Sequence, residues 1–123
     1  MRVKAKFKNK TGNSFEVDLE LYTFIQDGIR IIYAPALDLS GYGKTAEDSK
    51  KSFEETMTEF LNYTISNGTL TGELKRLGWH IQKHLSTPPT TEELISSNSQ
   101  LKEIIIGTGT YKKHTERISI PTC

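Results

Sequence analysis

One segment of this chain constrains its fold more than any other, because residues 45–66 carry the pattern of a single long amphipathic helix. Thr45 suits the N-cap of such a helix, and Asn67 and Gly68 suit a left-handed end. Apolar or small residues recur in steps of three, four or one, at Ala46, Ser49, Phe53, Met57, Phe60, Leu61 and Thr64. Such a stripe buries one helix face, so we expect this helix to cover a sheet of about three strands.

Two segments before the helix alternate between apolar and charged side chains, which is typical of half-buried strands. Residues 2–8 place lysines on one face, and the strand after the next turn places acidic side chains on one face. A hairpin between the two would put Lys4 and Lys6 opposite Asp18 and Glu16. We interpret the lysine stripe as half of a salt-bridge ladder. The alternative is a stripe that contacts nucleic acid.

The turn at Asp27-Gly28 is a strong hairpin signal, and Pro35 ends the strand that follows it. Around this turn the alternation breaks down, so both sheet faces are partly apolar; the residues are Tyr22, Phe24, Ile25, Ile29, Ile31, Ile32 and Tyr33. The C-terminal tail, a second copy of the chain or another protein could cover the second face. A β-bulge that shifts the register is the alternative explanation. The candidate partner-binding residues are Tyr22, Phe24, Ile31 and Tyr33.

The rest of the chain adds short elements. Residues 37–44 are expected to form a loop with two glycines. Beyond the long helix we expect short turns at 71–77, a strand at 79–82, a linker at 86–89, helix starts at 91–95 and 100–106, and a last strand at 116–120. The predicted fold class is therefore α+β: an antiparallel three- to four-stranded sheet (β-β-β-α-β), with one long helix packed on one face. Residues 1–85 would form this domain and residues 86–123 a C-terminal extension.

Composition excludes several functions and compartments. The chain has 123 residues and a net charge of +1, so no bulk charge draws it to nucleic acid or to a membrane. Its one cysteine, Cys123, cannot form an internal disulfide or a cysteine-built zinc site. No apolar run reaches the roughly 18 residues of a membrane span, and the N-terminus lacks the apolar core of a signal peptide. We therefore expect a cytoplasmic protein with no membrane partner.

Three motifs are candidates for a binding or catalytic site. The segment from Gly41 to Thr45 ends in Gly-Lys-Thr like a phosphate-binding loop, but Asp38 stands where that loop needs its first glycine. His80 and His84 have metal-ligand spacing only on a helix, and no third ligand is apparent. No serine or cysteine has a recognisable base. We expect no cofactor, no metal and no enzymatic activity.

A basic cluster near the C-terminus is the third motif. It contains Lys112, Lys113, His114 and Arg117. We interpret it as a solvated segment; the alternative is contact with phosphates or an acidic partner. The candidate nucleic-acid-binding residues are Lys112, Lys113 and Arg117.

The segment from Tyr33 to Asp48 resembles the signature of the HicB-like antitoxin family: a strand, a proline and a leucine, a glycine turn, a threonine cap, acidic residues and a long helix. The matching residues are Pro35, Leu37, Gly43, Thr45 and Glu47. The resemblance covers about residues 1–85. It implies a truncated ribonuclease-H-like fold without nuclease residues. Family members bind and inhibit a small ribonuclease toxin, oligomerise, and repress their operon through an added DNA-binding element.

The chain departs from the family pattern at two places. Asp38-Leu39-Ser40 stands where the family has Pro-Gly-Cys, and residues 86–123 do not match a helix-turn-helix or a ribbon-helix-helix. The resemblance thus implies a protein-interaction module with a small toxin as its partner, and a homodimer as a further possibility. The alternatives are a nucleic-acid-binding domain and a stand-alone HicB-like protein.

Overall fold

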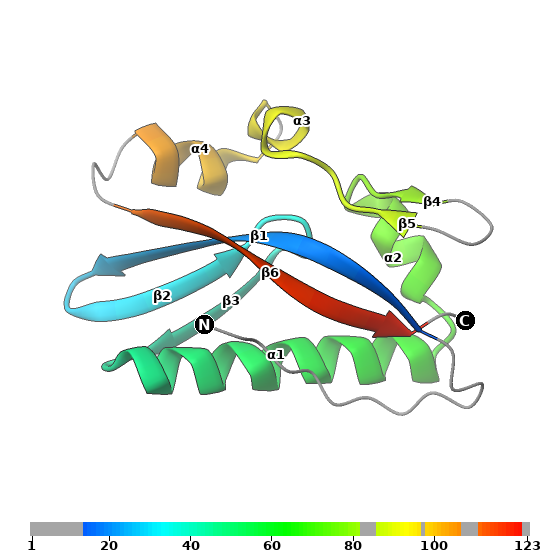
Figure 1. The fold of residues 1–123 in the computed structure, drawn as a ribbon, viewed down its shortest axis with the longest axis horizontal. Helices are drawn as coiled ribbons and strands as arrows, with labels where there is room; N and C mark the ends of the chain where they lie inside the picture. The colour runs from blue at the N-terminus through cyan, green and yellow to red at the C-terminus, as the bar shows by residue number, and fades with distance from the viewer. Residues whose placement is uncertain (1–13, 82–85, 97, 107–110, 122–123) are drawn as a thin grey trace.

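The computed structural model describes residues 14–81, 86–96, 98–106 and 111–121. The elements are β1 (Ser14–Gln26), β2 (Ile29–Ala34), β3 (Leu39–Gly43), α1 (Ala46–Ser66), α2 (Leu70–Arg76), β4 (His80–Ile81), β5 (Ser86–Thr87), α3 (Thr91–Ile95), α4 (Ser99–Ile106) and β6 (Lys112–Pro121). A four-stranded antiparallel sheet has the order β3-β2-β1-β6. Helix α1 lies on one face, and α3 and α4 lie on the other (Figure 1). The predicted α+β class with one long helix on the sheet is confirmed.

The hairpin between β1 and β2 turns at the predicted place. Asp27 and Gly28 have φ of +54° and +78°, and Gln26 pairs with Ile29 across them. A two-residue turn with both residues left-handed matches the right-handed twist of the two strands. The resulting register puts Tyr22 beside Tyr33, so two tyrosines share the same sheet face.

Residues 37–44 were expected to form a loop, and this expectation is wrong for most of the segment. Strand β3 occupies Leu39–Gly43 and pairs along β2 after a tight turn at Asp38, whose φ is +53°. Glycine is rare inside strands, which is why the segment resembled a loop. Here the glycines allow close approach: a Cβ on Gly41 would lie 2.4 Å from the backbone nitrogen of Phe53 in α1.

Helix α1 has the caps and the buried face that the sequence predicted. The Thr45 hydroxyl accepts a hydrogen bond from the Asp48 amide at 3.1 Å, and Asn67 is the C-cap. Gly68 follows with φ of +65°. The buried side chains of α1 are Ser49, Phe53, Met57, Leu61 and Thr64. They pack against the apolar face of β1, β2 and β6 to form the main core.

The strand predicted at 79–82 does not join the main sheet. Of the described residues 79–81, His80–Ile81 is extended and pairs with β5 in a separate two-stranded sheet, and Gln82 lies outside the described residues. Trp79, next to it, is buried and donates its indole N–H to the Ala36 carbonyl at 2.7 Å. This bond holds the segment after α1 against the turn that follows β2.

The fourth strand of the sheet comes instead from the C-terminal segment. Strand β6 contains the predicted strand at 116–120 and pairs with β1 from Ser14 opposite Pro121 to Thr23 opposite Lys112. The first predicted strand, at 2–8, lies outside the described residues, as does its pairing with β1. Among the described residues, no helix is both long enough and apolar enough to cross a membrane.

Candidate functional site

The second apolar face of the sheet is covered by the chain's own C-terminal segment. Tyr22, Phe24, Ile31 and Tyr33 are 1%, 8%, 8% and 1% exposed, and they pack against Leu101 and Ile104 of α4. Tyr111 packs against the same cluster, with its ring centroid 5.6 Å from that of Tyr22. The sequence left three possible covers for this face, which are the C-terminal tail, a second copy of the chain and another protein. In the structure the C-terminal tail covers it. The partner-binding role of the four residues stays a prediction.

Hydrogen bonds fix α4 on this face. The Tyr33 hydroxyl donates to the Asp38 carboxylate at 2.8 Å and accepts from the Asn98 side-chain amide at 2.9 Å. The carbonyl oxygen of the same Asn98 side chain accepts from the Leu101 amide at 2.9 Å, so Asn98 caps α4 while holding it to β2. Burial raises the pKa of Tyr33 above its ordinary value.

Helix α3 is held by a second tyrosine. The hydroxyls of Tyr22 and Thr91 share a hydrogen bond of 2.9 Å, and Thr91 also donates to the Glu20 carboxylate. Thr90 and Glu93 form a capping box at the start of α3, as Thr91-Glu92-Glu93 led us to expect of a helix start. A partner could contact the second face only if α3 and α4 moved away from it.

The segment that resembled a phosphate loop serves as a joint between sheet and helix. Gly41 and Gly43 pair with β2, and the Tyr42 amide donates to the Ser52 hydroxyl of α1 at 3.1 Å. The segment is thus a paired strand, and its backbone amides do not form the anion-binding loop that the Gly-Lys-Thr ending suggested. A Cβ on Gly43 would lie 2.4 Å from the Ser49 backbone nitrogen. The two glycines let α1 lie directly against β3.

Of the two spaced histidines, the structure describes His80 alone, so their predicted spacing is not tested. His84 lies outside the described residues, and the His80 Nε2 atom is 3.1 Å from a Glu93 carboxylate oxygen. This bond and the Thr90 bonds lower the pKa of the exposed Glu93 carboxyl. Within the described ranges, no three His, Cys, Asp or Glu side chains gather as metal ligands would.

Side chains alternate between the two sheet faces along β6, so the basic cluster of Lys112, Lys113, His114 and Arg117 is divided between them. On the α3 side, the Lys113 ammonium is 3.3 Å from Glu20, and the Arg117 guanidinium is 3.1 Å from Asp18. Lys112 and His114 face the α1 side, because their partners on β1 are Thr23 and Leu21. The three candidate nucleic-acid residues therefore do not form one continuous surface, and two of them are already paired with carboxylates.

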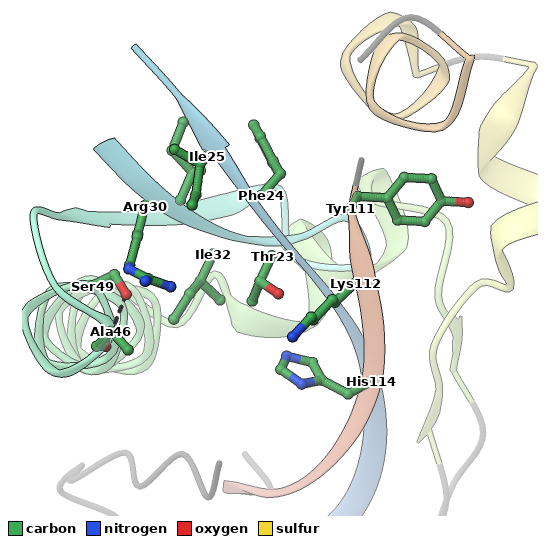
Figure 2. Close-up of a pocket in the computed structure, with 11 residues that line it drawn as sticks. Thr23, Phe24, Ile25, Arg30, Ile32, Ala46, Ser49, Tyr111, Lys112 and His114 are labelled. Atoms are coloured by element: carbon green, nitrogen blue, oxygen red, sulfur yellow. Dashed lines mark hydrogen bonds between the residues drawn. The ribbon is translucent and has the colours of Figure 1, made fainter. Parts of the chain in front are cut away.

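A hollow of about 400 Å³ opens on the α1 side of the sheet, beside the first turns of α1. Figure 2 shows that Arg30 from β2 and Lys112 and His114 from β6 border it, with Thr23 and Ile32 between them. The His114 Nε2 atom is buried and has no hydrogen-bond partner among the described residues. Burial also lowers the pKa of His114. Sequence reasoning missed Arg30, because only the β1–β6 pairing brings it near Lys112.

Comparisons of the chain with protein-family models, with curated proteins and with solved structures gave no significant match. The functional inference therefore depends on the residues and the geometry described above.

Proposed function

We propose that the chain is a non-catalytic protein-binding module that resembles the HicB antitoxins and that neutralises a small ribonuclease toxin. The observation that carries this proposal is the joint between β2 and α1, where the sequence resemblance lies. In it Pro35 follows β2, Gly41 and Gly43 press β3 against the helix, and Thr45 caps α1. Pro35, Gly43 and Thr45 are among the residues that match the family signature, and in the structure they lie at this joint.

The second face of the sheet is the surface we propose for the toxin. Its aromatic and aliphatic residues form a separate apolar cluster, distinct from the main core under α1. Helices α3 and α4 have five and eight residues, too short to be stable without the sheet. A toxin that offers a larger apolar surface could therefore displace them and bind Phe24 and Ile31 directly.

Co-expression tests the proposal. We expect a small protein to be encoded beside this gene and to arrest growth when induced alone. The present chain is expected to restore growth and to co-purify with it. The purified chain is also expected to inhibit RNA cleavage by that protein. Absence of both a complex and growth rescue would contradict the proposed function.

A pair of variants tests the surface. Phe24→Ala removes a large apolar side chain from the second face, whereas Tyr63→Ala removes one that is 70% exposed on α1. Truncating a well-packed apolar anchor typically weakens binding by about 2 kcal/mol or more, roughly 30-fold. We expect this loss for Phe24→Ala and no loss for Tyr63→Ala, after circular dichroism confirms that both variants are folded. Equal binding by the two variants would place the toxin elsewhere.

A further inference from the structure

We propose that the hollow beside the first turns of α1 binds a small organic anion, a carboxylate attached to an apolar body. Its cationic residues Arg30 and Lys112 face the α1 side, opposite the proposed toxin surface, whereas Phe24, Ile31 and Tyr111 of the second face also line the hollow. Anion binding there is a second binding function beside the proposed one. The inference combines unneutralised charge, an unpaired buried nitrogen and an exposed apolar wall at one place.

The charge at the hollow has no internal counterpart. Arg30 and Lys112 are both exposed, and neither makes an ion pair with any residue that the structure describes. Among the described residues, no acidic side chain lines the hollow; Glu116, two residues from His114, faces the same side of β6 outside the lining. Lys113 and Arg117, the neighbouring cations on β6, are by contrast paired with carboxylates of β1. In a chain with a net charge of only +1, positive charge thus remains concentrated at this hollow.

The register of the sheet brings these cations to one place. Thr23 of β1 pairs with Ile32 on β2 and with Lys112 on β6, so the three side chains lie in a row across the sheet. Arg30 is two residues from Ile32 and therefore points to the same face. Figure 2 shows the Arg30 and Lys112 side chains directed toward the space over this row.

His114 supplies the second argument. Its Nε2 atom is buried but lacks a partner in the described part of the chain. A buried polar atom without a hydrogen bond destabilises the folded state, and a ligand atom that pairs with it removes this cost. When Nε2 carries the proton it is a donor, and a carboxylate oxygen in the hollow would accept from it.

The walls of the hollow decide the class of anion. Ile25 is 60% exposed at its rim, and Ile32 forms part of its floor. Such a wall favours a ligand with an apolar body over a bare inorganic ion. A nucleic-acid backbone fits less well, because it needs a row of cations, and Lys113 and Arg117 face the other side. The volume of the hollow suits a small molecule of benzoate size.

The test uses the full chain and four probes: benzoate, acetate as charge alone, benzyl alcohol as the ring alone, and inorganic phosphate as a bare anion. Binding is followed by chemical-shift changes at His114 and along β6. We expect saturable shifts with benzoate, and at least tenfold weaker binding of the other three probes. Inorganic phosphate binding as tightly as benzoate would overturn the apolar part of the proposal, and no saturable shift with millimolar benzoate would overturn the whole.

Adjacent lysines on β6 provide a matched control. Charge-assisted hydrogen bonds contribute about 1.5–3 kcal/mol, so R30Q and K112Q are each expected to weaken benzoate binding about tenfold or more. K113Q removes the same charge from the opposite face and is expected to change it less than about twofold. An equal loss in K112Q and K113Q would mean that only general positive charge attracts the anion, which contradicts a built site. Phe24 and Ile31 line the hollow and also belong to the proposed toxin surface, so the titrations use the chain without a toxin, and their failure is distinct from failure of the proposed function.

Discussion

At the scale of single residues, Asn98 connects the cover to the sheet. It accepts a hydrogen bond from the Leu101 amide at the start of α4 and donates one to the Tyr33 hydroxyl of β2. Neither role was apparent from the polar stretch around residue 98, because capping requires a defined helix start and the tyrosine is 65 residues away. A single amide therefore positions a helix that sequence reasoning left unplaced.

Replacing this amide is expected to loosen α4. Asn98→Ala removes an N-cap and a partly buried hydrogen bond, so the free energy of unfolding should fall by about 1–3 kcal/mol in urea denaturation. Ser99→Ala, one residue further on at an exposed position, is the control and should change it by less than about 0.5 kcal/mol. If the two variants have equal stability, Asn98 does not hold the cover.

The partly buried His114 is expected to make the stability of the fold depend on pH. Burial lowers its pKa below the ordinary value of 6.5, although the nearby Glu116 carboxylate opposes this shift. The unfolded chain therefore binds more protons than the folded chain as pH falls through 6.5, and stability falls with it until the folded pKa is passed. Urea denaturation at about pH 7.5 and 5.5 should show a smaller loss for His114→Gln than for the unmodified chain. Identical losses would mean that His114 is not desolvated.

At the scale of elements, the approach of β3 to α1 depends on glycine. A Cβ at residue 41 would lie 2.4 Å from a backbone nitrogen of α1, so the helix itself would have to shift. Overpacking of this kind costs about 1–3 kcal/mol. Gly41→Ala is therefore expected to lower the midpoint of thermal unfolding.

The control for this prediction is a glycine in open space. A Cβ at Gly72 of α2 meets nothing within 4 Å, so Gly72→Ala removes only the flexibility of glycine in a helix. It should stabilise the chain by about 0.5–1 kcal/mol. Opposite signs for the two substitutions would support close packing at β3, whereas stabilisation by both would exclude it.

Local signals identified the hairpin at Asp27-Gly28 and the cap at Thr45, because the relevant contacts lie within a few residues. The pairing of β1 with β6 joins residues about 100 positions apart, such as Asp18 and Arg117, and no local pattern specifies it. The hollow around Arg30 could not be predicted for the same reason.

The basic cluster shows a different kind of error. Lys112 and Lys113 are adjacent in sequence and were grouped as one surface, but alternation along a strand sends them to opposite faces. Assigning residues 112–115 to the last strand would have separated them. The strand was predicted only from residue 116, because threonine, histidine and two lysines carry no apolar alternation.

At the scale of the whole molecule, both sheet faces are covered by parts of the same chain. Helix α1 covers one, and α4 with Tyr111 covers the apolar cluster of the other, where Tyr42, paired with Ile31, stays 56% exposed. In isolation the chain is therefore expected to be a monomer by light scattering. A stable dimer would contradict this prediction. Mapping its interface would then show whether it overlaps the surface proposed for the toxin.

The dependence of the sheet on its C-terminal strand leads to a last prediction, which concerns the boundary expected at residue 85. Strand β6 pairs with β1 over its whole length and contributes Ile118 and Ile120, 2% and 0% exposed, to the core under α1. A chain ending at residue 85 would lose these side chains, expose the second face and leave β1 with a free edge. We expect this fragment to be unfolded or aggregated by circular dichroism and light scattering.

Ile118→Ala in the full chain tests the same contact without removing the strand. It should lower the free energy of unfolding by about 2–5 kcal/mol. A fragment of residues 1–85 that unfolds cooperatively at the temperature of the full chain would show instead that β6 is an addition to an independent domain.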